Sequence, residues 1–332
     1  MTISRPLALA TALLAAGSLA ACSTGSATSS TSSQSGATTS STLKVEAAFY
    51  PLKYLTEQIG GDLVDVESLT PDGAEPHDLE LSPAAVDTLS KADAVVYLKG
   101  FQGAVDDAVE QAAPKTVVDV STAVQLVDAT ESGNHAGEEE DADEAESGHD
   151  HDAEEGHHHD MTADPHFWLD PERMGMAATA IGQALATADP DNAQTYTANA
   201  ASVTKAMKDL GAELVDGTAT CEHKTFVTAH TAFGYLADRT GLTQVGISGL
   251  DPESSPSPAR LQEISKLVKA EGVSTIFTEA LIDPKVAETL ANDLGIQTAV
   301  LDPIESQVDP QKDYSAVMRD NITALQKALT CK

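Results

Sequence analysis

The chain has 332 residues, of which 41% are hydrophobic, and a formal net charge of -33. This length is enough for two lobes of ordinary size, each with its own buried residues. Such a strong excess of acids excludes a nucleic-acid-binding surface, because phosphate backbones attract basic proteins.

The first residues of the chain predict an export signal. After Arg5 comes an apolar run, LALATALLAAGSLAAC, which is too short to span a bilayer comfortably. It ends in Leu19-Ala20-Ala21-Cys22, which resembles the lipobox of bacterial lipoproteins. We therefore expect residues 1–21 to be a signal peptide and Cys22 to be lipidated, with an ordinary signal peptide or an uncleaved anchor as alternatives. Residues 22–42 are rich in Ser and Thr and predict a flexible tether.

The next segment, residues 43–128, alternates between strand and helix patterns. Short apolar runs bounded by turn residues predict buried strands, and longer amphipathic segments predict helices. Ser82 followed by Pro83 is typical of the first residues of a helix. The expected strands are 43–49, 63–69, 93–98 and 115–120, and the expected helices are 54–60, 82–92 and 105–113.

An acidic, histidine-rich tract then interrupts the pattern. From Glu131 to Asp160 the sequence holds 13 acids and no Lys or Arg, so we expect a solvated, mobile loop over about residues 129–162. Imidazoles and carboxylates are ligands for zinc, and the tract is a candidate weak auxiliary metal loop. The alternative is a charged loop in which the histidines are incidental. Those histidines are His135, His149, His151, His157, His158 and His159.

After the tract, two helices precede a second alternating array. The second of these helices, expected over 190–216, would reach close to 40 Å if straight and could act as a rigid strut. The fold class is therefore α/β, with lobes at 43–189 and 217–332, each built on a four-stranded parallel sheet, joined by a long rigid helix. The expected helices are 171–188, 190–216, 231–240, 257–272, 284–295 and 313–329, and the expected strands are 224–229, 242–247, 273–278 and 297–301.

Potential metal ligands follow several of these strands. In open α/β sheets, ligands bind beyond the carboxyl ends of the strands. Three imidazoles and one carboxylate suit the four-coordinate geometry that zinc prefers, although a single histidine at a strand end is more commonly a hydrogen-bonded loop residue. Nearby carboxylates could accept an N–H bond and orient an imidazole. The candidate ligands are His77, His166, His230 and Asp302, with Glu279 at a matching strand exit; the supporting carboxylates are Glu75, Asp164 and Asp170. His223 precedes its strand and should lie at the opposite end.

Five phrases occur in a characteristic order: EPHDLELSP, DPHFWLDP, TAHTAFGYLA, FTEA and LDPIE. Together they resemble the cluster A-I, or cluster 9, solute-binding proteins of bacterial ABC uptake transporters for zinc and manganese. The resemblance implies that His77, His166 and His230 bind metal and that Asp302 completes the site as a weaker ligand. Glu279 would contact a metal-binding side chain and not the metal itself. Whether Asp302, Glu279 or water is the fourth ligand stays open.

The resemblance also predicts the metal and the partner. Manganese and iron binders of this kind generally carry Glu where this chain has His230, so a third imidazole favours Zn²⁺, and the acidic tract resembles the loop of high-affinity zinc-uptake members. We expect a monomer, with no enzymatic activity, attached to the outer face of the cell membrane and delivering zinc to an ABC permease.

Three alternative functions stay open. A manganese or iron carrier and a metal-storage or adhesin lipoprotein would share this fold. A zinc hydrolase is a more distant alternative, since the chain has no HExxH and a fourth ligand would close the site.

If Cys22 carries lipid, Cys221 and Cys331 are left as a pair. In an exported protein such a pair predicts a disulfide. Two reduced cysteines or a metal-binding pair are the alternatives.

Overall fold

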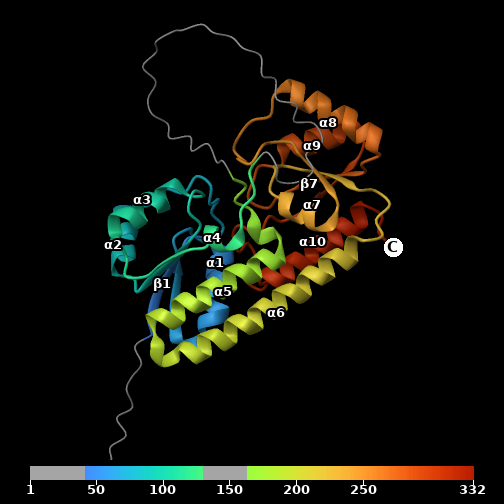
Figure 1. The fold of residues 1–332 in the computed structure, drawn as a ribbon. Coiled ribbons are helices and arrows are strands. Elements are labelled where there is room, and N and C mark those ends of the chain that lie inside the picture. The colour runs from blue at the N-terminus through green and yellow to red at the C-terminus, as the bar shows by residue number, and fades with distance from the viewer. Residues whose placement is uncertain (1–41, 130–162) are drawn as a thin grey trace, which may run out of the picture. The chain divides into compact units, whose positions relative to one another are not determined.

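The computed structural model describes residues 42–129 and 163–332, and it contains two parallel sheets of four strands each (Figure 1). The first sheet has the order β2-β1-β3-β4 and the second has the order β6-β5-β7-β8. The two orders correspond, so each lobe is built in the same way, and the prediction of two parallel sheets is confirmed. The strands are β1 (Leu43–Ala47), β2 (Val64–Ser68), β3 (Ala94–Tyr97), β4 (Val117–Asp119), β5 (Thr225–Thr228), β6 (Thr243–Gly246), β7 (Thr275–Thr278) and β8 (Gln297–Val300).

Helices connect successive strands and cover the sheets. Ser82 accepts a hydrogen bond from Ala85 N at the start of α2, as predicted, and Ser257 accepts one from Arg260 N at the start of α8. The helices of the first lobe are α1 (Tyr50–Gly60), α2 (Pro83–Lys91), α3 (Gly103–Ala112), α4 (Ser121–Val124) and α5 (Pro171–Ala188). Those of the second are α7 (Gly234–Thr240), α8 (Pro258–Glu271), α9 (Lys285–Leu294) and α10 (Tyr314–Ala328).

The long helix is α6 (Ala193–Thr218), and a short 3₁₀ turn over Pro190–Asn192 precedes it. Its 26 residues correspond to about 39 Å. Helix α6 packs along α5 and also contacts α10 of the second lobe (Figure 1). At Gly182 in α5, an added Cβ would lie 2.4 Å from the Cβ of Ala200, so only glycine permits the close approach of α5 to α6. The strut is therefore packed against both lobes.

The two lobes share one apolar core. Phe49 and Trp168 from the first lobe belong to the same buried cluster as Phe226, Phe277 and Met318 from the second. A smaller cluster lies under α8 and α9. Because the described residues belong to one compact unit, the positions of side chains between the lobes are defined by continuous packing.

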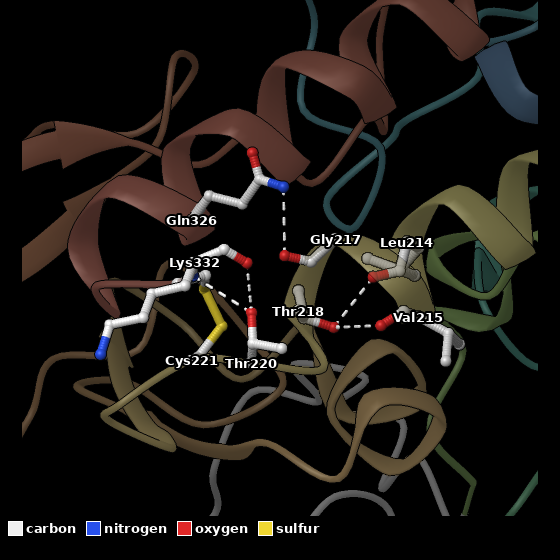
Figure 2. The surroundings of a disulfide bond; sticks show 9 residues. Leu214, Val215, Gly217, Thr218, Thr220, Cys221, Gln326 and Lys332 are labelled. Atoms are coloured by element: carbon white, nitrogen blue, oxygen red, sulfur yellow. Dashed lines mark hydrogen bonds between the residues drawn. A yellow bond between two sulfur atoms is a disulfide. The ribbon is translucent and has the colours of Figure 1, made fainter.

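A disulfide joins Cys221, just before β5, to Cys331 near the chain end, as the sequence predicted. Hydrogen bonds surround it: Thr220 and Lys332 bond to each other, and Gln326 of α10 donates to Gly217 O at 3.1 Å (Figure 2). These contacts fasten the end of α6 to the end of α10.

Several predicted features lie outside the described residues. They are the signal peptide, the lipidation site Cys22, the tether, and the tract histidines His135, His149, His151, His157, His158 and His159. Among the described residues, no helix combines the length and the apolar character needed to cross a membrane.

Candidate metal centre

Four side chains bring one potential ligand atom each to a common point between the lobes. They are His77, His166, His230 and Glu305, and their ligand atoms all lie within 4.8 Å of one another. His77 follows β2, His166 precedes α5, His230 follows β5, and Glu305 follows β8. Each is thus delivered from the carboxyl end of a strand or from a loop beside it, where open α/β sheets bind ligands.

The spacing of these atoms suits a small tetrahedral ion. Glu305 Oε1 lies 3.5 Å from His77 Nε2, 3.4 Å from His166 Nε2 and 3.5 Å from His230 Nε2. The Nε2 atoms of His166 and His230 are 3.4 Å apart. These distances exceed those of good hydrogen bonds. These four distances are close to the edges of about 3.3–3.4 Å expected for a tetrahedron with bonds of about 2.0–2.1 Å, the Zn–N distance in proteins, and the other two pairs of ligand atoms lie within 4.8 Å.

Two of the ligand atoms are buried without a hydrogen-bond partner among the described residues. They are His77 Nε2 and Glu305 Oε1. Burial of an unpaired polar atom is costly, so such a pair facing each other indicates a bound group. The rings of Phe101 and Trp168 pack against His77 and His166, with centroids 4.8 and 5.2 Å away, and exclude water from this side.

His166 is held by a carboxylate from its own segment. Asp164 Oδ1 lies 2.8 Å from His166 Nδ1 and accepts a second bond, of 2.9 Å, from the His166 main-chain N–H. Burial is the largest influence and disfavours the imidazolium, but the hydrogen bond to Asp164, the charge of Asp164 and the contact with Glu305 together raise the pKa of His166. The Asp164 contact makes Nδ1 the donor and leaves Nε2 free to face the metal centre.

His230 has the strongest carboxylate support. Both oxygens of Glu279 lie within 2.8 Å of His230 Nδ1, and Oε1 also accepts the His230 main-chain N–H at 3.1 Å. Glu279 follows β7, the neighbour of β5 in the sheet. Burial opposes protonation of His230, but the negative charge of Glu279 together with Glu305 raises its pKa to about 10.

His77 is held through its backbone. Glu75 Oε1 accepts the His77 main-chain N–H at 2.8 Å, so its carboxylate supports the loop and not the ring. Burial lowers the pKa of His77 and keeps this imidazole neutral. Burial, with the negative charge of Glu305, raises the pKa of Glu75 to about 8.

The carboxylate in the cluster is that of Glu305, where the sequence predicted Asp302. Asp302 Oδ1 accepts the main-chain N–H of Ile304 at 2.7 Å, and Ile304 has a φ of 58°, a conformation that non-glycine residues rarely adopt. Glu305 follows this turn directly and extends into the cluster. Asp302 therefore supports the turn. Asn321 bonds to its main-chain N–H and C=O at 2.9 and 2.7 Å.

The charge state of Glu305 fits this position. Burial opposes its ionisation, but contacts with the three imidazoles hold its pKa well below the usual range.

One predicted supporting carboxylate lies elsewhere. Asp170 caps α5 by accepting the main-chain N–H of Glu172 at 2.9 Å, and it lies 3.2 Å from the guanidinium of Arg239. Its position at a helix start, with basic partners, explains why it does not reach an imidazole. His223 lies before β5, at the opposite end of the sheet from the cluster, as predicted.

Comparison with known proteins gives the family. Residues 45–328 match the family model of the zinc-uptake complex component A, periplasmic. The chain belongs to this family. It is 36% identical over 290 residues to the zinc-binding protein AdcA of Streptococcus pyogenes, covering 86% of this chain and 55% of that protein. The chain thus spans about half the length of this curated relative.

Two further similarities extend over most of both chains. The high-affinity zinc uptake system protein ZnuA of Bacillus subtilis is 34% identical over 297 residues, with 87% of this chain and 88% of that protein covered. The crystal structure of AdcAII from Streptococcus pneumoniae superposes with a TM-score of 0.72 and 32% identity, covering 87% of this chain and 99% of that one. The family fold is therefore shared along nearly all of the described residues.

Sequence reasoning missed Glu305, although it lies at the end of the quoted phrase LDPIE. The rule of strand exits selects the first acid after β8, which is Asp302, and cannot foresee the positive φ at Ile304. It also missed Gln102 and Gln244, buried amides whose Nε2 atoms donate to Pro76 O at 3.0 Å and to His230 O at 3.1 Å. Gln102 lies just after a predicted strand and Gln244 within one, which is unusual for a polar amide and was the available signal.

Proposed function

We propose that this chain captures one Zn²⁺ ion between its lobes and delivers it to an ABC permease. The ion is the transported substrate, bound by His77, His166, His230 and Glu305. The convergence of three Nε2 atoms and one carboxylate oxygen, all within 4.8 Å of one another, carries this proposal. The names of the relatives, zinc-binding and zinc-uptake proteins, support it.

The same arrangement favours binding over catalysis. Catalytic zinc sites keep one coordination position open for water, whereas this set supplies four protein ligands. We therefore assign no catalytic residue. Export and attachment by lipid on Cys22 would place a monomeric carrier on the outer face of the membrane, and weak zinc binding by the acidic histidine tract would supply the main site.

Titration of the metal-free protein with Zn²⁺, Mn²⁺ and Fe²⁺ tests the proposal. Zinc should bind tightly with one ion in the main site. In a variant lacking residues 131–160, so that the tract does not mask the result, His166→Ala should lower zinc affinity by orders of magnitude. Unchanged tight binding would refute the assignment. Removal of the tract alone should leave the tight site intact while lowering the total zinc bound.

A matched pair of substitutions decides the fourth ligand. Glu305→Gln removes the carboxylate at the cluster, and Asp302→Asn makes the same change three residues earlier, where the amide oxygen can still accept from Ile304. We expect Glu305→Gln to weaken zinc binding by at least about 100-fold, since it removes a charged ligand. Asp302→Asn should cost less than about 5-fold. The reverse order would restore Asp302 as the ligand.

Competition between Zn²⁺ and Mn²⁺ for the main site distinguishes a zinc carrier from a manganese or iron carrier. His230→Glu replaces an imidazole with a harder, charged oxygen and should shift the Zn²⁺/Mn²⁺ preference towards Mn²⁺. An unchanged ratio would show that His230 does not select the metal.

A further inference from the structure

Tyr235 joins the segments that carry two of the histidines. It lies in α7 of the second lobe and is 2% exposed. Its hydroxyl donates to the main-chain carbonyl of Asp164 at 2.8 Å and accepts the main-chain N–H of Val127 at 3.0 Å. Asp164 N also donates to Val127 O at 3.1 Å. One phenol oxygen thus binds both strands of the small pairing that continues at the Asp128–Ala163 bridge.

The hydrogen bond between Tyr235 and Asp164 lies close in sequence to both His230 and His166. Tyr235 follows His230 by five residues in one continuous segment, and Asp164 precedes His166 by two. Asp164 also orients the His166 ring through its carboxylate. The Tyr235–Asp164 bond is therefore a short connection between two segments whose imidazole Nε2 atoms are only 3.4 Å apart.

The aromatic ring of Tyr235 is held separately from its hydroxyl. The guanidinium of Arg173 in α5 lies 4.6 Å from the ring centroid, and it also donates to the carbonyls of Val124 and Gln125. A cation over the ring face is attracted by its quadrupole. Removal of the hydroxyl alone should leave this contact and the packing of α7 in place.

We propose that Tyr235 is a positioning residue: its hydroxyl fixes the distance between His166 and His230 and so slows the release of the bound metal. This inference rests on the proposed function. In a tetrahedral zinc site, the ligand atoms lie about 3.3–3.4 Å from one another. Without the hydroxyl, the Asp164–His166 segment and the His230–α7 segment lose a direct bond, and the two imidazoles can separate when the metal leaves.

The test is Tyr235→Phe in the full chain, with the zinc dissociation rate measured by stopped-flow transfer to a chromogenic chelator. Groups behind metal ligands typically change affinity by about 10–100-fold, so we expect dissociation to be about 10-fold faster. Tyr196→Phe is the matched control. Tyr196 is fully buried and its hydroxyl donates to the carboxylate of Asp189 at 3.0 Å where α5 meets α6, so Tyr196→Phe also removes a hydroxyl bond but does so away from every proposed ligand.

A spectroscopic measurement separates positioning from general destabilisation. The absorption bands of Co²⁺ bound in place of zinc report the ligand geometry. They should shift in Tyr235→Phe and stay unchanged in Tyr196→Phe, while both variants lose similar thermal stability. Identical Co²⁺ spectra and equal zinc dissociation rates in the two variants would overturn the inference.

Double substitutions test which residue transmits the effect of Tyr235 to the metal ligands. Asp164→Ala keeps the main-chain carbonyl that Tyr235 contacts and removes the carboxylate that holds the His166 ring. If the effect of Tyr235 reaches His166 through that carboxylate, Tyr235→Phe should add little to the effect of Asp164→Ala, whereas it should add fully to that of Glu279→Ala. Full additivity with both would also overturn the inference. Failure of the parent protein to bind zinc would instead refute the proposed function, so the two failures are distinguishable.

Discussion

The two lobes fix the main chain beside His77 and His230 by the same hydrogen-bond pattern, but they support the two imidazole rings differently. In each lobe a buried glutamine amide donates to a threonine hydroxyl and to a carbonyl at the histidine loop. Gln102 donates to Thr70 Oγ1 at 2.9 Å and to Pro76 O at 3.0 Å. In the second lobe, Gln244 donates to Thr228 Oγ1 at 3.0 Å and to His230 O at 3.1 Å. The backbone beside each of these ligands is thus fixed in the same way.

The difference lies at the imidazole rings. Glu279 binds the ring Nδ1 of His230, whereas Glu75 binds the main-chain N–H of His77. As a result the two pKa values move in opposite directions: burial lowers that of His77, and the carboxylates overcome burial to raise that of His230 to about 10. For this pair of ligands, the second lobe holds the ring of His230 by charge, while the first lobe holds the loop that carries His77. His166, the other ligand of the first lobe, resembles His230, because the carboxylate of Asp164 holds its ring.

The second lobe is also closed covalently, and this gives the largest predicted effect. Replacing Cys221 and Cys331 with Ser opens a loop with a sequence separation of 110 residues. The chain-entropy model gives a loss of about 4–5 kcal/mol in the free energy of unfolding, as an upper bound. Urea denaturation should show it as a lower midpoint, with zinc affinity of the folded protein nearly unchanged.

A neighbouring substitution controls for local disturbance. Thr220→Val removes the hydroxyl that bonds to Lys332 beside the disulfide and leaves the covalent link intact (Figure 2). It should cost only about 1 kcal/mol. If the two changes shift the midpoint equally, the covalent closure contributes nothing beyond local contacts.

The next effect concerns the carboxylates behind the rings. Glu279→Gln removes the charge that faces His230 Nδ1 and should weaken zinc binding by about 10–100-fold. Glu75→Gln should change it by less than about 5-fold, because Glu75 contacts only a main-chain N–H and its pKa of about 8 makes it neutral at pH 7 in the absence of metal. Zinc competition with a chelator measures both; equal losses would remove the proposed difference between the lobes.

Much of this arrangement follows from sequence pattern, and the remainder has identifiable causes. The alternation of strands and helices and the strand-exit histidines depend on local periodicity and on the rule for parallel sheets, both visible in the chain. The role of Glu305 depends on a positive φ at Ile304, and that of Tyr235 on the packing of α7 against a segment about 70 residues away. Contacts of this kind arise from tertiary structure and have no local signature.

The raised pKa of His230 predicts how zinc binding depends on pH. With a pKa of about 10, this imidazole keeps its proton at pH 7 in the metal-free protein, so zinc must displace at least one proton. The apparent affinity should therefore rise with pH, by at least about tenfold per unit between pH 6 and 8, and continue rising above the range of an ordinary histidine. The lowered pKa of His77 reduces its part in this proton release, whereas the raised pKa of His166 adds to it.

Calorimetry in buffers of different ionisation enthalpy measures this proton release directly. Glu279→Gln serves as the control, since it removes the main cause of the raised pKa and should reduce the number of protons released at pH 8. A zinc-binding enthalpy that does not depend on the buffer would contradict a protonated His230.

The smallest predicted effect concerns the hydrogen bonds of Gln102 and Gln244. Gln102→Leu and Gln244→Leu keep the side-chain volume but remove the bonds to Pro76 O and His230 O. A buried hydrogen bond contributes about 1 kcal/mol, so each change should affect zinc binding by about 5-fold or less. Gln102→Leu should have the larger effect on zinc. Among the described residues, no carboxylate other than the proposed ligand Glu305 contacts the His77 ring, whereas Glu279 still holds the ring of His230. Gln326→Leu, which removes a similar bond to Gly217 O near the disulfide, should leave zinc affinity unchanged. A larger loss from Gln244→Leu than from Gln102→Leu would mean that the backbone bond, and not the charge of Glu279, is what holds His230 in place.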